Sequence, residues 1–135
     1  MNKIRFTTSI IVFLLLSGNA VAKSPAGQIK KILSVTKARP GFCVVLGCDD
    51  DGSLAGELAR TGKFLVHGLV LHERKLLPAR QRIIAMKLYG TASIDVFAPP
   101  RLPYVDELVN VLVVKNLPEM LAAGCTMEEI LRVLA

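Results

Sequence analysis

The segment 42–60 constrains the fold of this chain more than any other stretch. An apolar run, FCVVLG, leads into an acidic loop, CDDDG, and then into SLAGELAR, in which Leu54 and Leu58 lie one helical turn apart. Continuous apolar runs with β-branched residues are typical of parallel strands that are covered on both faces. The segment therefore predicts a buried strand, a tight loop and a helix, which is how an open α/β sheet forms a ligand crevice at the carboxyl end of a strand.

The rest of the chain repeats this alternation. Apolar runs predict further strands over 64–71, 92–97 and 108–114. Helical spacing predicts helices over 28–37 and 73–88. We expect the second helix to begin in earnest near Leu77, because Pro78 is tolerated only in the first turn of a helix. Short helices are predicted after Pro118 and after Thr126. Alternating strands and helices imply parallel pairing through right-handed crossovers. We expect a Rossmann-like α/β fold with a mostly parallel sheet of about four strands, in the order 3-2-1-4, and flanking helices.

The N-terminus has the pattern of a secretory signal peptide. Lys3 and Arg5 precede an apolar run over 10–16, and Ala20-Val21-Ala22 supplies the small residues of a cleavage site. The run is too short for a stable membrane span, which needs about 20 residues. We expect residues 1–22 to be a signal peptide, 23–40 a linker and N-terminal helix, and 41–135 a partial α/β domain that is exported to the periplasm or secreted.

The last predicted strand raises the question of what covers its outer edge. The sequence stops directly after a helix that should lead into another strand. If the fourth strand flanks the first, its outer edge has no partner, and an open apolar edge favours aggregation. We therefore expect a truncated domain whose fourth-strand edge is covered by a C-terminal continuation or by a partner chain.

Charge and cysteine content exclude several classes of function. The formal charge of +6 falls to +4 without the leader, the basic residues are scattered, and there is no Trp, so a nucleic-acid surface is not expected. The three cysteines are odd in number and cannot form a complete disulfide framework within one chain. Cys43 lies within a predicted strand and is interpreted as a core residue, whereas Cys48 lies in the loop at the strand end.

The acidic loop excludes the common phosphate and metal sites. Its glycines do not have the dinucleotide spacing, there is no phosphate-loop lysine, and Asp49, Asp50 and Asp51 would repel a pyrophosphate. A calcium loop would place a ligand at Gly47, and the two histidines lack the spacing of a metal pair. We expect no metal. An ordinary acidic helix N-terminus remains an alternative reading of the three aspartates.

From about residue 41 onward, the chain resembles the first half of a class I S-adenosylmethionine-dependent methyltransferase domain. The resemblance rests on VVLGCDDDG at 44–52, LVHGLVL at 65–71, ASIDVFAPPRLPY at 92–104 with DELVNVLVV at 106–114, and EEILRVLA at 128–135. More narrowly, it is similar to methyltransferase-like N-terminal regions of exported bacterial proteins that continue into quinoprotein-type β-propeller repeats. The resemblance implies S-adenosylmethionine as the cofactor.

The resemblance also implies which residues would face that cofactor, and several of them depart from the family pattern. The glycine-rich loop corresponds to Gly47, Cys48, Asp49, Asp50, Asp51 and Gly52. The acid that ends the second strand and takes the ribose hydroxyls corresponds to Val70. The acid near the adenine falls at about Ala98, with Asp95 close by, and the acid before the first glycine corresponds to Val45.

Two functional hypotheses follow from these departures. The first is a degenerate, non-catalytic methyltransferase-like domain of an exported protein that keeps the fold for a structural or interaction role. The alternative is an active S-adenosylmethionine-dependent methyltransferase of unknown acceptor, in which the protein mainly positions the reactants. Fold alone does not decide between them.

Overall fold

The computed structural model describes residues 10–13, 25–37, 39–48 and 51–134. The elements of the first part of the chain are β1 (Ile10–Phe13), α1 (Pro25–Thr36), β2 (Gly41–Leu46), α2 (Ser53–Arg60) and β3 (Phe64–Val70). They are followed by a 3-10 turn, η2 (Glu73–Lys75), then α3 (Leu76–Ala85), β4 (Ala92–Val96), β5 (Val111–Val114), α4 (Leu117–Ala122) and α5 (Met127–Val133).

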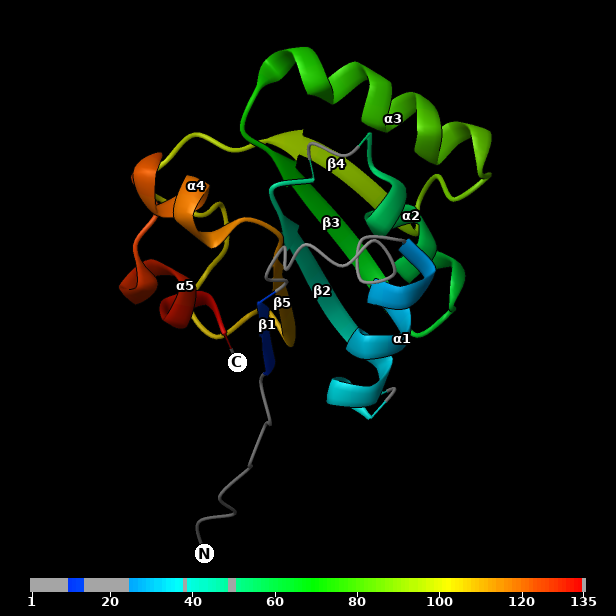
Figure 1. Ribbon diagram of the computed structural model, residues 1–135, viewed down its shortest axis with the longest axis horizontal. Helices are drawn as coiled ribbons and strands as arrows, with labels where there is room; N and C mark the ends of the chain where they lie inside the picture. Colours follow the sequence, from blue (N-terminus) through cyan, green and yellow to red (C-terminus); the bar gives the residue numbers. More distant parts are fainter. Residues whose placement is uncertain (1–9, 14–24, 38, 49–50, 135) are drawn as a thin grey trace, which may run out of the picture.

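The strands form one parallel sheet in the order β1-β5-β2-β3-β4 (Figure 1). The four predicted strands are β2, β3, β4 and β5, and their spatial order β4-β3-β2-β5 confirms the predicted 3-2-1-4 arrangement. The central pair is in continuous register from Gly41 opposite Phe64 to Leu46 opposite Leu69. The middle of the sheet is thus the strand that precedes the acidic loop.

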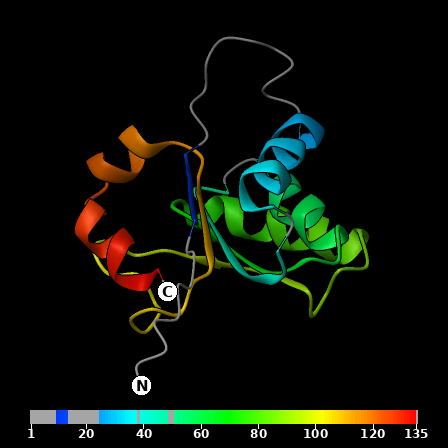
Figure 2. The ribbon, with the colours of Figure 1, turned by 90° about the horizontal axis from the view of Figure 1, so that it is seen from below.

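The helices cover the two faces of the sheet in separate groups. Helices α1, α2 and α3 lie on one face and α4 and α5 on the other, as Figure 2 shows with the sheet seen edge-on. Each face has its own buried cluster: Val45 and Val66 pack with α2 residues such as Leu58, whereas Val44 and Leu69 pack with α4 and α5 residues. Alternate residues of one strand therefore serve opposite cores, which explains why the strands are apolar throughout.

The outer edge of β5 differs from the sequence-based expectation. That edge was predicted to lack a partner within the chain, but Ile10–Phe13 pair with it along its whole length, from Ile10 opposite Val111 to Phe13 opposite Val114. The same four residues lie within the apolar run of the predicted signal peptide, and three of them are β-branched, which suits a strand. Signal-peptide cleavage stays a prediction.

β5 itself begins later than predicted, because the residues before it contact other elements. Val109 forms a bridge with Leu134 after α5, and its N–H donates to the Val133 carbonyl at 2.8 Å. The Asn110 side chain accepts the N–H of Phe42 at 2.9 Å. The regular ladder with β2 therefore starts only at Val111.

The N-terminal caps of the last two helices agree with the sequence pattern. Thr126 has extended backbone angles, and its side-chain oxygen accepts the N–H of Glu129 at 3.1 Å. At the start of α4, the side-chain oxygen of Asn116 accepts the N–H of Glu119 at 3.2 Å. Within the described residues, no helix is long and apolar enough to cross a membrane.

Replacing Thr126 by alanine is expected to lower the free energy of unfolding by about 1 kcal/mol, because an N–H in the first turn of α5 loses its acceptor. Urea unfolding followed by circular dichroism would measure the change. The exposed Thr91, which lies outside the helices, supplies the control substitution Thr91→Ala. Equal stability of the two variants would contradict the capping role.

Candidate functional site

The candidate site lies at the carboxyl ends of the central strands, where the acidic loop leaves β2. Backbone hydrogen bonds hold these strand ends together. The N–H groups of Gly47 and Cys48 both donate to the Leu69 carbonyl, at 2.9 and 3.0 Å, and Phe97 N–H donates to the Val70 carbonyl at 2.8 Å. The loop therefore starts from a fixed position beside β3.

Gly47 is in close contact with a helix from the opposite face. Its φ of +80° is in the left-handed region, which favours glycine. A Cβ placed on Gly47 would lie 2.9 Å from the methyl carbon of Met120 in α4. The space next to the first loop glycine is thus occupied by a side chain of the protein.

Cys48, which was predicted to line the crevice, is turned into the core. Its side chain is fully buried among the residues of α2 and α3. It packs over Gly68 of β3, where an added Cβ would lie 2.7 Å from Cys48 Sγ. Cys43 is also fully buried, and burial raises the pKa of its thiol to about 12, in agreement with its prediction as a core residue.

The described part of the acidic loop is held by α3. Asp51 accepts a hydrogen bond from Ser53 and one from the Arg82 guanidinium at 2.6 Å. Partial desolvation raises the pKa of Asp51, but these hydrogen bonds and the Arg82 charge outweigh it, so that the pKa is lowered. Gly52 begins α2 with a φ of +80°, and an added Cβ there would lie 3.2 Å from Ala79 of α3. Asp49 and Asp50 lie outside the described residues.

Val70 is the residue at the position of the ribose-binding acid. It is fully buried at the end of β3 and belongs to the core between the sheet and α2 and α3. An aliphatic side chain there offers no acceptor to a hydroxyl group. Just beyond it, Nε2 of His72 lies 3.5 Å from Oε1 of Glu119 in α4.

Asp95 lies in β4 and is engaged by two neighbouring side chains. His67 Nε2 of β3 is 2.7 Å from Asp95 Oδ2, and the Arg80 guanidinium of α3 donates to Asp95 Oδ1 at 2.8 Å. The other ring nitrogen of His67 contacts the hydroxyl of Tyr104, which lies in the loop before β5. Burial raises the pKa of Tyr104, and the nearby Asp95 and Cys43 add to this effect. The carboxylate is therefore part of a network of protein side chains, and 53% of the Asp95 side chain stays exposed.

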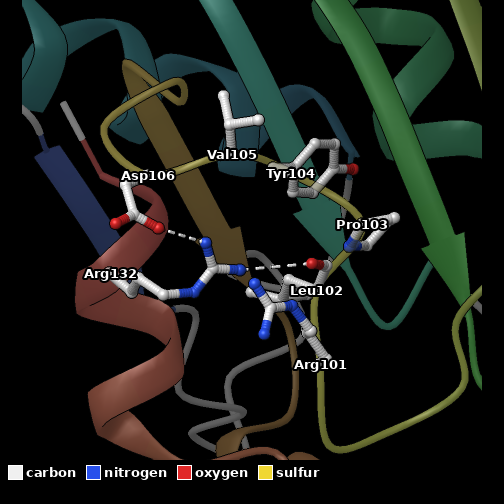
Figure 3. A pocket seen from close by; sticks show the side chains of 7 residues that line it. All are labelled: Arg101, Leu102, Pro103, Tyr104, Val105, Asp106 and Arg132. Atoms are coloured by element: carbon white, nitrogen blue, oxygen red, sulfur yellow. Dashed lines mark hydrogen bonds and ion pairs between the residues drawn. The ribbon is translucent and has the colours of Figure 1, made fainter.

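A cavity of about 710 Å³ lies between the loop before β5 and α5. Figure 3 shows Arg132 pointing into it from α5, beside Arg101 of the loop, and Tyr104 lines another part of the cavity. The Arg132 guanidinium donates to Asp106 at 2.6 Å, to Glu129 at 2.6 Å and to the Leu102 carbonyl at 3.3 Å. Acceptors of the protein thus hold the Arg132 guanidinium in place at the cavity wall.

The residues that contact the predicted site residues could not be identified from the sequence. Arg82, Met120 and His67 come from other elements, at sequence distances of 28 residues or more from the residues they meet. One local signal existed: glycine in the middle of an apolar strand, as at Gly68, indicates close approach of another group. Within the described residues, no group of three or more His, Cys, Asp or Glu side chains could hold a metal ion.

Comparison with solved structures shows which fold this is. The chain superposes on a protein of Methanococcus maripaludis assigned as an S-adenosyl-L-methionine-dependent methyltransferase, with a TM-score of 0.69 and 20% identity, covering 84% of this chain and 54% of that one. An S-adenosylmethionine-dependent methyltransferase from Aquifex aeolicus matches with a TM-score of 0.61 and 16% identity, over 78% of this chain and 57% of that one. No family model and no curated protein sequence matches the chain.

A third similar structure has a different reaction in its name. The [4+2]-cyclase SpnF matches with a TM-score of 0.69 and 22% identity, over 79% of this chain and 40% of that one. The chain thus spans about half the length of these structures or less. At these identities the likeness establishes the fold: the chain has the Rossmann-like fold of class I S-adenosylmethionine-dependent methyltransferases.

Proposed function

We propose that this chain is a non-catalytic methyltransferase-fold domain of an exported protein and that it serves a structural or interaction role. The fold is that of S-adenosylmethionine-dependent enzymes, so the proposal depends on whether the residues of the crevice fit that cofactor. Where the family pattern requires acceptors for the ribose, this chain has an aliphatic core residue.

The burial of Val70 is the observation that carries the proposal. Its side chain is fully enclosed between the sheet and the helices. Loss of a carboxylate that pairs with a buried ribose leaves two hydroxyls without acceptors, at roughly 1–3 kcal/mol each. A loss of this size weakens binding by orders of magnitude, since about 1.4 kcal/mol corresponds to a factor of ten.

The other groups of the crevice support the same conclusion. Asp51 is paired with Arg82, and Asp95 is paired with His67 and Arg80. Met120 fills the space beside Gly47. The described residues of the crevice therefore do not offer S-adenosylmethionine the contacts that the family pattern implies.

The predicted export is consistent with a domain that does not use the cofactor. A signal peptide over 1–22 would place the mature domain in a compartment where S-adenosylmethionine is not expected to be supplied. The suggested continuation into β-propeller repeats would give the domain a neighbour to contact. Both statements are predictions from the sequence, and N-terminal sequencing of the exported protein would test the first.

Isothermal titration of the full chain with S-adenosylmethionine and S-adenosylhomocysteine tests the proposal directly. We expect no saturable heat with millimolar ligand, which corresponds to a binding free energy weaker than about −4 kcal/mol. Micromolar binding would contradict the proposal. If such binding occurred, Asp51→Asn should weaken it and Asp106→Asn, which alters an exposed carboxylate near α5, should not.

A further inference from the structure

We propose that the outer edge of β5 is a strand-accepting surface for an extended, uncharged apolar segment, and that the leader segment Ile10–Phe13 occupies it in the uncleaved chain. Removal of the leader would then open this edge to another strand of the same type. The inference concerns the sheet edge and is independent of cofactor binding.

The composition and burial of β5 fit a strand with a neighbour on each side. All four of its residues, Val111 to Val114, are buried, and none carries a polar side chain. One side pairs with β2 from Cys43 to Leu46, and the other side pairs with β1 from Ile10 to Phe13. Without β1, a row of backbone donors and acceptors on this edge would lack strand partners.

The opposite edge of the sheet is protected in a different way. Arg80 reaches over β4 from α3, and its Nε donates to the Ile94 carbonyl at 2.9 Å. Ser93 and Asp95 of the same strand are exposed and polar. Arginine on the backbone and polar side chains on the strand are typical of edges that do not pair further. The described residues of β5, Val111–Val114, carry no polar side chain, so this protection is missing on the β5 edge.

The segment on the β5 edge is also the one that export would remove. Ile10–Phe13 lie in the apolar run of the predicted leader, and the predicted cleavage after Ala22 separates them from β5. Strand addition to an exposed edge is a common mode of peptide recognition, in which backbone hydrogen bonds supply affinity and alternate side chains supply specificity. The partner that fits is therefore an extended apolar strand that runs parallel to β5.

A cysteine cross-link in the unprocessed full chain tests whether Ile10–Phe13 occupies the outer edge of β5. Val12 and Val113 are register partners, so Val12→Cys with Val113→Cys should form an intramolecular disulfide under mild oxidation. The control pairs Val12→Cys with Leu112→Cys, because a shift of one residue moves the side chain to the other face of the sheet. The three native cysteines are buried and supply little background. Equal cross-linking of both pairs, or cross-linking between two chains, would overturn the proposal.

Hydrogen exchange tests whether the edge accepts a strand in trans. Val12→Pro in the full chain should speed exchange of the outward-facing amides of Val111–Val114 by about tenfold or more, because the paired strand is broken. Leu16→Pro, in the same apolar run but outside β1, is the matched control. A peptide carrying Ile-Ile-Val-Phe between flanking lysines should restore protection in the Val12→Pro chain. Unchanged exchange in that variant, or no restoration by the peptide, would contradict the proposal.

Discussion

Replacing Gly68 by alanine is expected to lower the free energy of unfolding by about 1–3 kcal/mol, the cost of adding a methyl group to a packed core. The new Cβ would lie 2.7 Å from both Cys48 Sγ and the Ile94 Cδ1 atom. The isoleucine methyl is the end of a flexible side chain and can move, but the short cysteine side chain is enclosed. Urea unfolding at neutral pH would measure the loss.

A second substitution shows whether Cys48 is the cause. Adding Cys48→Ala to Gly68→Ala should recover part of the lost stability, with a coupling free energy of about 1 kcal/mol between the two sites. Cys125→Ala is the matched control, because Cys125 is equally buried but belongs to the core on the other face. Coupling of Gly68→Ala to Cys125 rather than Cys48 would show that Cys48 does not pack where the structure places it.

Replacing Glu129 by glutamine is expected to destabilise the protein by about 1–3 kcal/mol at pH 7, because Arg132 and a backbone donor lose a charged acceptor. The carboxylate accepts the N–H of Leu102 at 2.8 Å and two hydrogen bonds from Arg132, at 2.6 and 2.9 Å. These contacts fasten the long loop before β5 to α5. Loss of the carboxylate should therefore loosen the loop that carries Tyr104.

The same substitution has a predicted dependence on pH. The hydrogen bond from Arg132, opposed by partial desolvation and helped by Leu102, lowers the pKa of Glu129 from 4.5 to about 2. A lowered pKa stabilises the folded state above pH 4.5, and this contribution is lost as the pH falls toward 2. The stability difference between the native chain and Glu129→Gln should shrink between pH 7 and pH 3. Glu128→Gln, an exposed change in the same helical turn, should show no such trend.

The sheet could be predicted because its signals are local. Each of the four predicted strands is an apolar run bounded by turn residues, and the alternation with helices fixes parallel pairing. Two boundaries were missed for identifiable reasons. Helix α1 begins at Pro25, three residues before the predicted start at Gln28, because proline is well suited to the first helical position. β5 begins at Val111 because Val109 pairs with Leu134 instead.

The edge strand β1 could not be predicted because its residues fit two patterns. Ile-Ile-Val-Phe is suited to a strand and equally to the apolar run of a leader, and the charged residues before it favoured the leader. Only the register with β5 shows that the segment completes the sheet. In the uncleaved chain the edge of the fourth predicted strand is therefore paired, and an open edge stays a prediction for the chain without its leader.

The place of the acidic loop between β2 and α2 could be predicted from the sequence, but the side chains that surround the loop could not. The glycines at 47 and 52 adopt positive φ, as a tight loop requires. What the sequence could not reveal is which side chains reach that loop from elsewhere in the chain. Met120 and Arg82 meet it through tertiary packing, and the pairing of His67 with Asp95 depends on the register of β3 and β4.

Chemical-shift mapping of the ¹⁵N-labelled full chain with S-adenosylmethionine tests the central claim most directly, since it detects weak binding and locates it. The account predicts that millimolar ligand leaves the amides of Gly47, Gly52, Val70 and Asp95 unshifted. Saturable shifts confined to those amides, with a micromolar dissociation constant, would contradict it.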